Sequence, residues 1–306
     1  MILPAPQTPS VHRRRHAAAP AILALAGAAA CGGLGGLEGD LRDRIEQSPA
    51  EVVGVYLKNL EAGDSLLIDA DVRMHAASTM KVPVMIQVFR DADAEWFALE
   101  DSVPVTATFR SIADASAYEL DRADDSDSTL YERVGRGATL RELTELMITV
   151  SSNLATNILI GLVGPGRVQH TMVRLGADSI AVLRGVEDGP AYRAGMNNTT
   201  TARDLGVILT AIAEDEAASA EACAEMRDIL ARQRFNDGIP AGLPVGTRVA
   251  HKTGWITGIA HDAAIVEPEG GPRYVLVVLT RGIEDHAEAN RLIADLSRMA
   301  YEDLIP

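Results

Sequence analysis

Cysteine is nearly absent from this chain, since Cys31 and Cys223 are the only two among 306 residues. Two cysteines cannot form the disulfide framework of a small secreted scaffold, and no cluster of cysteine and histidine has the spacing of a zinc site. We therefore expect no metal and no other cofactor. Proline-rich linkers, low-complexity tracts and internal repeats are also missing from residue 37 onward. Residues 37–306 are thus predicted to form one compact domain, and we expect a monomer.

Positive charge is scarce as well. The chain has 28 lysines and arginines against 43 acidic residues, a formal net charge of −15. Such a surface repels phosphate backbones, which argues against a nucleic-acid partner. A hydrophobic content of 47% is that of a packed globular protein, so general disorder is excluded. Lysine is the rarest basic residue, with three copies, Lys58, Lys81 and Lys252.

The N-terminal segment has the pattern of an export signal. Three arginines at 13–15 precede an apolar stretch at 17–30 that is too short to span a membrane. Small residues at 28–30 are followed by Cys31 and a glycine-rich stretch at 32–36. We predict that 1–36 is a signal peptide with a flexible tether, and that the mature protein is extracytoplasmic, either periplasmic or secreted. A lipid on Cys31 would be its only membrane attachment; ordinary signal cleavage and a disordered N-terminus remain alternatives.

Strand-like segments lie at both ends of the remaining chain, and helical patterns lie between them. This order predicts an α+β fold in which the N- and C-terminal segments form one antiparallel sheet, flanked by helices, with an inserted all-helical lobe. The acidic stretch at 121–128 is predicted to be a solvated loop without chemistry. The predicted strands are 51–60, 65–70, 248–255, 263–266 and 274–279, and the predicted helices include 140–150, 157–162, 202–212, 220–232 and 288–304.

Ser78 and Lys81 are the first candidates for chemistry. A helix that begins near Ser78 would bring the two side chains to one face, about one turn apart. A serine hydroxyl is a weak nucleophile until a base takes its proton, and a desolvated lysine is able to act as that base. An arginine at 81 would keep its proton permanently.

Two further motifs follow along the chain. Ser151 and Asn153 lie between predicted helices, where a serine can relay a proton to a leaving nitrogen and an asparagine amide can bind an acylamide. Lys252, Thr253 and Gly254 lie in a predicted strand, where the lysine can face a substrate anion and the glycine permits close approach.

These three ordered motifs resemble those of the serine β-lactamases and penicillin-binding proteins. The flanking residues 148–157, 198–201 and 241–246 narrow the similarity to class A enzymes, over about residues 45–305. The resemblance implies that Ser78 is acylated, with Lys81 as its proton partner and Ser151 as proton shuttle. It also implies that Asn153, Lys252 and Thr253 bind substrate, and that the backbone N–H groups of Ser78 and Trp255 form an oxyanion hole.

The sequence departs from the class A pattern at several positions. Ser152 replaces an aspartate, and Asn198 replaces an aspartate that would pair with Arg184. Glu187 is a candidate base for the deacylating water, but it follows Arg184 by three residues, one more than in the family. Its alternative role is that of a loop residue that caps or bridges. Trp255 occupies a position where a small residue is usual.

We therefore predict an exported serine hydrolase that acts through an acyl-enzyme at Ser78, with a β-lactam as first-choice substrate. A D,D-peptidase or esterase of the same fold, acting on a peptidoglycan-like substrate, is one alternative. A receptor that is acylated by β-lactams or peptidoglycan without turnover is another. Packing or hydrogen-bonding roles are expected for His75, His251, His261 and Asp262, and Arg281 is a secondary candidate for a substrate carboxylate.

Overall fold

The central element is a five-stranded antiparallel sheet with the strand order β2-β1-β11-β10-β9. The N-terminal strand β1 pairs with the C-terminal strand β11, with Val52 opposite Arg281 and Asn59 opposite Tyr274. The prediction of one sheet built from both ends of the chain is therefore confirmed. A computed structural model describes residues 34–305, and within them the sheet strands are β1 (Val52–Asn59), β2 (Ser65–Ile68), β9 (Arg248–Ile256), β10 (Ile259–Glu267) and β11 (Tyr274–Arg281).

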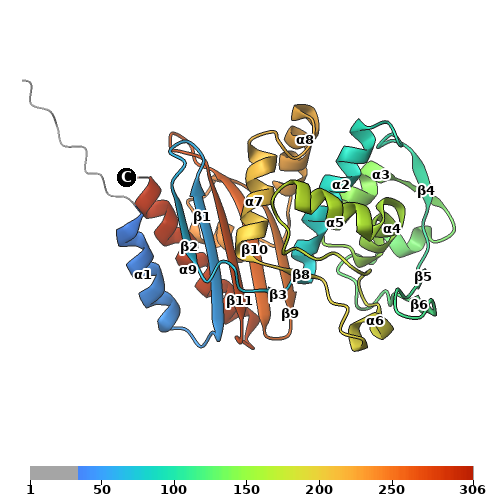
Figure 1. Cartoon of the computed structure of the whole chain (residues 1–306), viewed down its shortest axis with the longest axis horizontal. Coiled ribbons are helices and arrows are strands. Elements are labelled where there is room, and N and C mark those ends of the chain that lie inside the picture. The colour runs from blue at the N-terminus through green and yellow to red at the C-terminus, as the bar shows by residue number, and fades with distance from the viewer. Residues whose placement is uncertain (1–33, 306) are drawn as a thin grey trace, which may run out of the picture. The chain divides into compact units, whose positions relative to one another are not determined.

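Helices cover both faces of this sheet (Figure 1). On one face, apolar side chains of the sheet pack against α1 (Gly35–Glu46) and α9 (His286–Leu304). On the other face, α7 (Ala202–Ala213) contacts β1, β10 and β11. The first helix begins at Gly35, so Gly35 and Gly36 belong to the folded domain and not to the tether predicted for 32–36.

The inserted lobe contains α2 (Lys81–Asp93), which forms its centre and is buried over most of its length. Its residues 82–89 are apolar except for Gln87, as expected for a helix in a core. The other lobe helices are α3 (Leu140–Thr149), α4 (Asn153–Val163), α5 (Pro165–Arg174), α6 (Gly189–Arg193) and α8 (Ala220–Leu230), with 3₁₀ turns at Ala77–Met80, Leu130–Arg133 and Ile239–Gly242.

Short strand pairs supplement the predicted helical lobe. The sequence does not predict these pairs, because strands of two or three residues are too short to show a recognisable pattern of apolar residues. The pairs are β4 (Ser102–Pro104) with β7 (Gly137–Thr139), β5 (Thr108–Arg110) with β6 (Ala117–Glu119), and β3 (Met74–His75) with β8 (Thr199–Thr200).

The predicted export signal and Cys31 lie outside the described residues. No helix among residues 34–305 is both long and apolar enough to cross a membrane.

Candidate active site

A cavity of about 860 Å³ lies where β9 meets the lobe. Its walls include Ser78, Ser151, Asn153, Thr253 and Trp255, so the three sequence motifs converge on one space. The candidate base also borders it, because Glu187 lies in the same wall. Among residues 34–305, no three His, Cys, Asp or Glu side chains come together as a metal ion would require.

Strained backbone surrounds this cavity. Seven non-glycine residues in the described range have positive φ, and three of them line the cavity: Ala77 (+45°), Ser151 (+58°) and Glu187 (+60°). Such a conformation costs a residue with a side chain about 1–3 kcal/mol and persists only where neighbouring contacts impose it. The three strained positions directly precede or carry candidate catalytic side chains.

Ser78 lies in the 3₁₀ turn Ala77–Met80, which leads directly into α2. Strand β9 packs against this turn at Gly254. A Cβ atom on Gly254 would lie 2.9 Å from the backbone nitrogens of both Ser78 and Thr79, closer than real Cβ atoms approach. Glycine is therefore required here by the close approach of the strand to the candidate nucleophile.

Lys81 extends from the first turn of α2 toward the α3–α4 connection. Its Nζ donates to the Ser151 carbonyl oxygen at 2.6 Å, to Ser151 Oγ at 3.0 Å and to Asn153 Oδ1 at 2.9 Å. The side chain is fully buried, and burial lowers the pKa of Lys81 to about 7, against the opposing effect of the Asp125 and Glu187 charges. A lysine with this pKa is partly neutral near pH 7 and can accept a proton.

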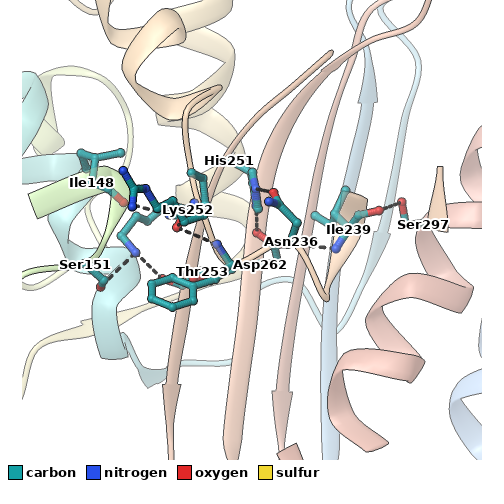
Figure 2. A network of polar contacts seen from close by, with 12 residues as sticks. Ile148, Ser151, Asn236, Ile239, His251, Lys252, Thr253, Asp262 and Ser297 are labelled. Atoms are coloured by element: carbon teal, nitrogen blue, oxygen red, sulfur yellow. Dashed lines mark hydrogen bonds and ion pairs between the residues drawn. The ribbon is translucent and has the colours of Figure 1, made fainter. Parts of the chain in front are cut away.

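Lys252 reaches the same hydroxyl from strand β9, as Figure 2 shows. Its Nζ donates to Ser151 Oγ at 3.1 Å and to the Thr253 carbonyl oxygen at 2.8 Å. Burial, followed by the nearby charge of Lys81, lowers the pKa of Lys252 well below its usual value, while Asp262 opposes this shift. The Ser151 hydroxyl thus lies between two buried amines, an arrangement suited to passing a proton.

The turn that presents Ser151 is held by a residue that the sequence analysis missed. Asp125 accepts hydrogen bonds from the backbone N–H groups of Asn153 at 3.0 Å and Leu154 at 2.8 Å. Ser152 caps α4 by accepting from the Ala155 N–H. The carboxylate expected at position 152 is therefore supplied from the acidic loop.

Residues 121–128 form a largely exposed loop, as predicted, but this loop also borders the cavity, which the sequence did not indicate. Asp124, Asp125 and Ser126 all line the cavity, and Ser126 Oγ donates to the Ser151 carbonyl oxygen at 3.1 Å. The loop packs against the α3–α4 turn in three dimensions, and no local sequence pattern reveals that pairing.

Glu187 faces Asn153 despite its displacement along the chain. The Asn157 side chain binds the backbone of Val186, the residue before Glu187. It accepts from the Val186 N–H at 2.6 Å and donates to the Val186 carbonyl at 3.0 Å. The left-handed backbone at Glu187 then directs the carboxylate to Asn153 Nδ2, at 3.2 Å from Oε1. Although Glu187 is exposed at the cavity mouth, the cavity walls partly desolvate it and, with Asp124, raise its pKa.

The segment before Glu187 is held by hydrogen bonds to Asn198. The Asn198 side chain accepts from the backbone N–H groups of Leu183 and Arg184 and donates to the Arg184 carbonyl at 2.9 Å. The Arg184 guanidinium instead donates to the Met196 carbonyl at 3.0 Å and to Asn197 Oδ1 at 3.3 Å. Hydrogen bonds from the Asn198 amide to the backbone therefore take the place of the arginine–aspartate ion pair that the class A pattern has at this position.

Trp255 follows Gly254 on the edge strand and is 59% exposed. Its ring lies 5.1 Å from that of His286, at the start of α9. Phe235, Tyr192 and Ile256 are also exposed around the cavity. The cavity mouth thus has an apolar rim, and of its residues only Trp255 stood out in the sequence.

Behind Lys252, the buried pair of His251 and Asp262 links the sheet to the 3₁₀ turn Ile239–Gly242 (Figure 2). His251 Nδ1 lies 2.9 Å from Asp262 Oδ1, and Asp262 Oδ2 accepts from the Ile239 N–H at 2.9 Å. These contacts agree with the bracing roles expected for both residues. Arg281 is paired with Glu51 at 3.5 Å and is not in the cavity wall, so the structure does not support its role as a substrate contact.

The comparisons of this chain with a family model, with related sequences and with solved structures agree on one family. A family model described as "Beta-lactamase enzyme family" matches residues 36–304. A β-lactamase of Streptomyces fradiae is 30% identical over 272 residues, which cover 87% of this chain and 85% of the relative. A solved structure of PBP-A has a TM-score of 0.76 at 28% identity and covers 89% of this chain and 96% of its own. A β-lactamase structure from Sphaerobacter thermophilus has a TM-score of 0.75 at 28% identity, with 88% and 98% coverage.

Proposed function

Because this chain belongs to the β-lactamase enzyme family, we propose that it hydrolyses the amide bond of β-lactams through an acyl-enzyme on Ser78. The observation that carries the proposal is the convergence of Lys81 and Lys252 on the Ser151 hydroxyl beside Ser78. This arrangement offers a nucleophile, a base of lowered pKa and a proton relay within one cavity.

In the acylation step, neutral Lys81 takes the Ser78 hydroxyl proton while Ser78 Oγ attacks the lactam carbonyl carbon. The C–N bond of the lactam then breaks, and the leaving nitrogen receives a proton from the Ser151 hydroxyl. Ser151 regains a proton from the amine of Lys81 across their 3.0 Å contact. The N–H groups of Ser78 and Trp255 are the donors proposed for the oxyanion that forms in between.

Substrate recognition is assigned to Asn153 and Thr253, which line the cavity, and to Lys252, which is buried beside the Ser151 hydroxyl. Lys252 and Thr253 would bind the substrate carboxylate, whose negative charge would favour the protonated amine of Lys252 and thus a charge-assisted hydrogen bond. Asn153 would bind the acylamide, using the amide group that also contacts Lys81 and Glu187.

In the deacylation step, Glu187 would take a proton from water as the water oxygen attacks the Ser78 ester. The ester C–O bond then breaks, Ser78 regains its proton, and the ring-opened acid leaves. The contact with Asn153 supports this role, because it brings the carboxylate to the wall where the acylamide is expected.

A second candidate function is acylation with slow release. Asn157 forms hydrogen bonds with the backbone of Val186 and not with that of Glu187. The position of the Glu187 carboxylate therefore depends on the strained left-handed backbone of Glu187 itself. If that conformation relaxes, the ester persists, as in a receptor or a poorly hydrolysing penicillin-binding protein.

Ring opening of a chromogenic cephalosporin by the purified protein tests the proposed function. We expect multiple turnovers per molecule, and a loss of about 10³-fold or more in Ser78→Ala. Ser128→Ala, at an exposed serine of the acidic loop, is the matched control and should match wild type. Hydrolysis that survives Ser78→Ala would exclude this nucleophile, and one product per molecule would favour the slow-release candidate.

Export is a separate proposal that rests on the sequence of residues 1–36. We expect Cys31→Ser to release the protein from the membrane fraction if Cys31 is lipidated, and to leave a secreted protein unchanged otherwise. Full-length protein found only in the cytosol would contradict both routes.

A further inference from the structure

The turn that carries Ser78 depends on an unfavourable backbone conformation at the residue before it. Ala77 has a φ of +45°, a region that residues with a Cβ rarely adopt. The dihedral angles of Ala77 fix the peptide plane that ends in the Ser78 N–H, the proposed oxyanion donor. Contacts that hold Ala77 therefore also set the direction of that donor.

His75 supplies one of these contacts. Its Nδ1 accepts a hydrogen bond from the Ala77 N–H at 3.0 Å. A backbone N–H can donate only to a nitrogen with a free lone pair, so the ring must be neutral with its proton on Nε2. Protonation of His75 would turn Nδ1 into a donor, and this hydrogen bond would be lost.

A second histidine anchors His75 to the sheet. His261, fully buried on β10, donates from Nε2 to the His75 carbonyl oxygen at 3.0 Å, and its Nδ1 lies 2.8 Å from the Ala260 carbonyl oxygen and 3.3 Å from the Thr280 nitrogen. Burial lowers the pKa of His261 to about 4, so its ring stays neutral. A continuous chain of contacts thus connects β11 and β10 to the nucleophile turn.

We propose that His75 is a positioning residue for acylation, and that its neutral imidazole holds Ala77 and thereby aims the Ser78 N–H. Protonation of His75 releases the turn and lowers the rate of acylation, while the fold remains. The inference rests on the proposed acyl-enzyme function, because it describes how the same site responds to pH.

The surroundings of His75 favour the neutral form near pH 7. His75 is half-buried in the cavity wall, so protons can reach it from solvent. The charged and titratable groups that face it are the Arg184 guanidinium and the ring of His261. Burial and then the charge of Arg184 lower the pKa of His75, so its protonation is expected below pH 6.5.

Three substitutions separate the hydrogen bond from the titration. In His75→Asn, the amide Oδ1 can accept from the Ala77 N–H two residues ahead, as in an Asx turn, but it does not titrate in this range. In His75→Leu the acceptor is removed. His170→Asn, at an exposed histidine of α5, is the matched control.

The experiment follows the Ala77 and Ser78 amide signals by NMR in ¹⁵N-labelled full-length protein between pH 4.5 and 8. In parallel, the rate of acylation by a penicillin is measured across the same range. In wild type and His170→Asn, acylation should fall in two steps as the pH drops: one near pH 7, where Lys81 is protonated, and a second below pH 6.5 that shares its midpoint with the amide shifts. His75→Asn should acylate near the wild-type rate at pH 7.5 with only the second step removed, and His75→Leu should acylate about 10- to 100-fold more slowly at all pH values.

Three results would overturn the inference: amides that do not respond to the titration of His75, a second acid step that persists unchanged in His75→Asn, or wild-type acylation by a folded His75→Leu. Failure of the proposed function would be recognised separately. A wild-type protein that forms no adduct at pH 7.5 would contradict the proposed function, whereas the amide signals of Ala77 and Ser78 would still report whether the titration of His75 affects this turn.

Discussion

Replacement of Glu187 by glutamine removes the proposed base while retaining the size and hydrogen-bonding capacity of the side chain. Its amide oxygen can still accept from Asn153 Nδ2, which lies 3.2 Å from Oε1 in the wild type. Acylation uses Ser78, Lys81 and Ser151, so it should be nearly unchanged. A general base contributes about 10²–10⁴-fold in rate, which corresponds to about 2.7–5.4 kcal/mol of the deacylation barrier.

Rapid-quench mass spectrometry with a good penicillin measures the two steps separately. In Glu187→Gln we expect the acyl-enzyme to accumulate, with deacylation slowed by about 10²–10⁴-fold. Because the pKa of Glu187 is raised, wild-type deacylation should fall as the pH drops through a value above 4.5, where the carboxylate becomes protonated. That dependence should disappear in Glu187→Gln. Glu269→Gln, at an exposed glutamate that is not among the residues lining the cavity, is the control. Equal deacylation rates in Glu187→Gln and wild type would refute the reasoning.

The remaining predictions concern three other positions. Lys252→Ala should raise KM for carboxylate-bearing β-lactams by about 10- to 100-fold, because a charge-assisted hydrogen bond is lost, and steady-state kinetics with a neutral ester should show a much smaller change. Asp125→Asn should lower the free energy of unfolding by about 1–2 kcal/mol, measured in urea, because one carboxylate oxygen at the start of α4 is lost; the exposed neighbour Asp124→Asn should change it little. Trp255→Ala should weaken the binding of substrates with a bulky aromatic substituent about 3- to 10-fold and leave small substrates unaffected, as equilibrium binding to Ser78→Ala variants would show.

The sheet and the motif residues could be predicted because local patterns specify them. Runs of β-branched and aliphatic residues in β1 and β11 identify buried strands, and family resemblance gives the roles implied for Ser78, Lys81 and Lys252. Strand β10 was predicted to begin at 263, whereas it begins at Ile259. The polar residues His261 and Asp262 interrupt its apolar pattern, yet both are buried and satisfied by hydrogen bonds.

The second layer of the site could not be predicted, because it depends on which loops meet in three dimensions. Asp125 replaces the carboxylate missing at Ser152, although 27 positions separate the two along the chain. Asn157 contacts Val186 across a similar interval. Both side chains belong to segments whose local composition indicates only a polar loop or a helix. Their function arises from packing between segments, which a single sequence does not encode in any short pattern.

Intact-mass spectrometry over time, after addition of a penicillin, is the most direct test of the central claim. We expect the wild-type protein to gain the mass of one penicillin and then to return to its free mass as the drug is hydrolysed, whereas Ser78→Ala should never gain it. A penicillin adduct on Ser78→Ala, or penicillin hydrolysis at the wild-type rate by that variant, would exclude an acyl-enzyme on Ser78.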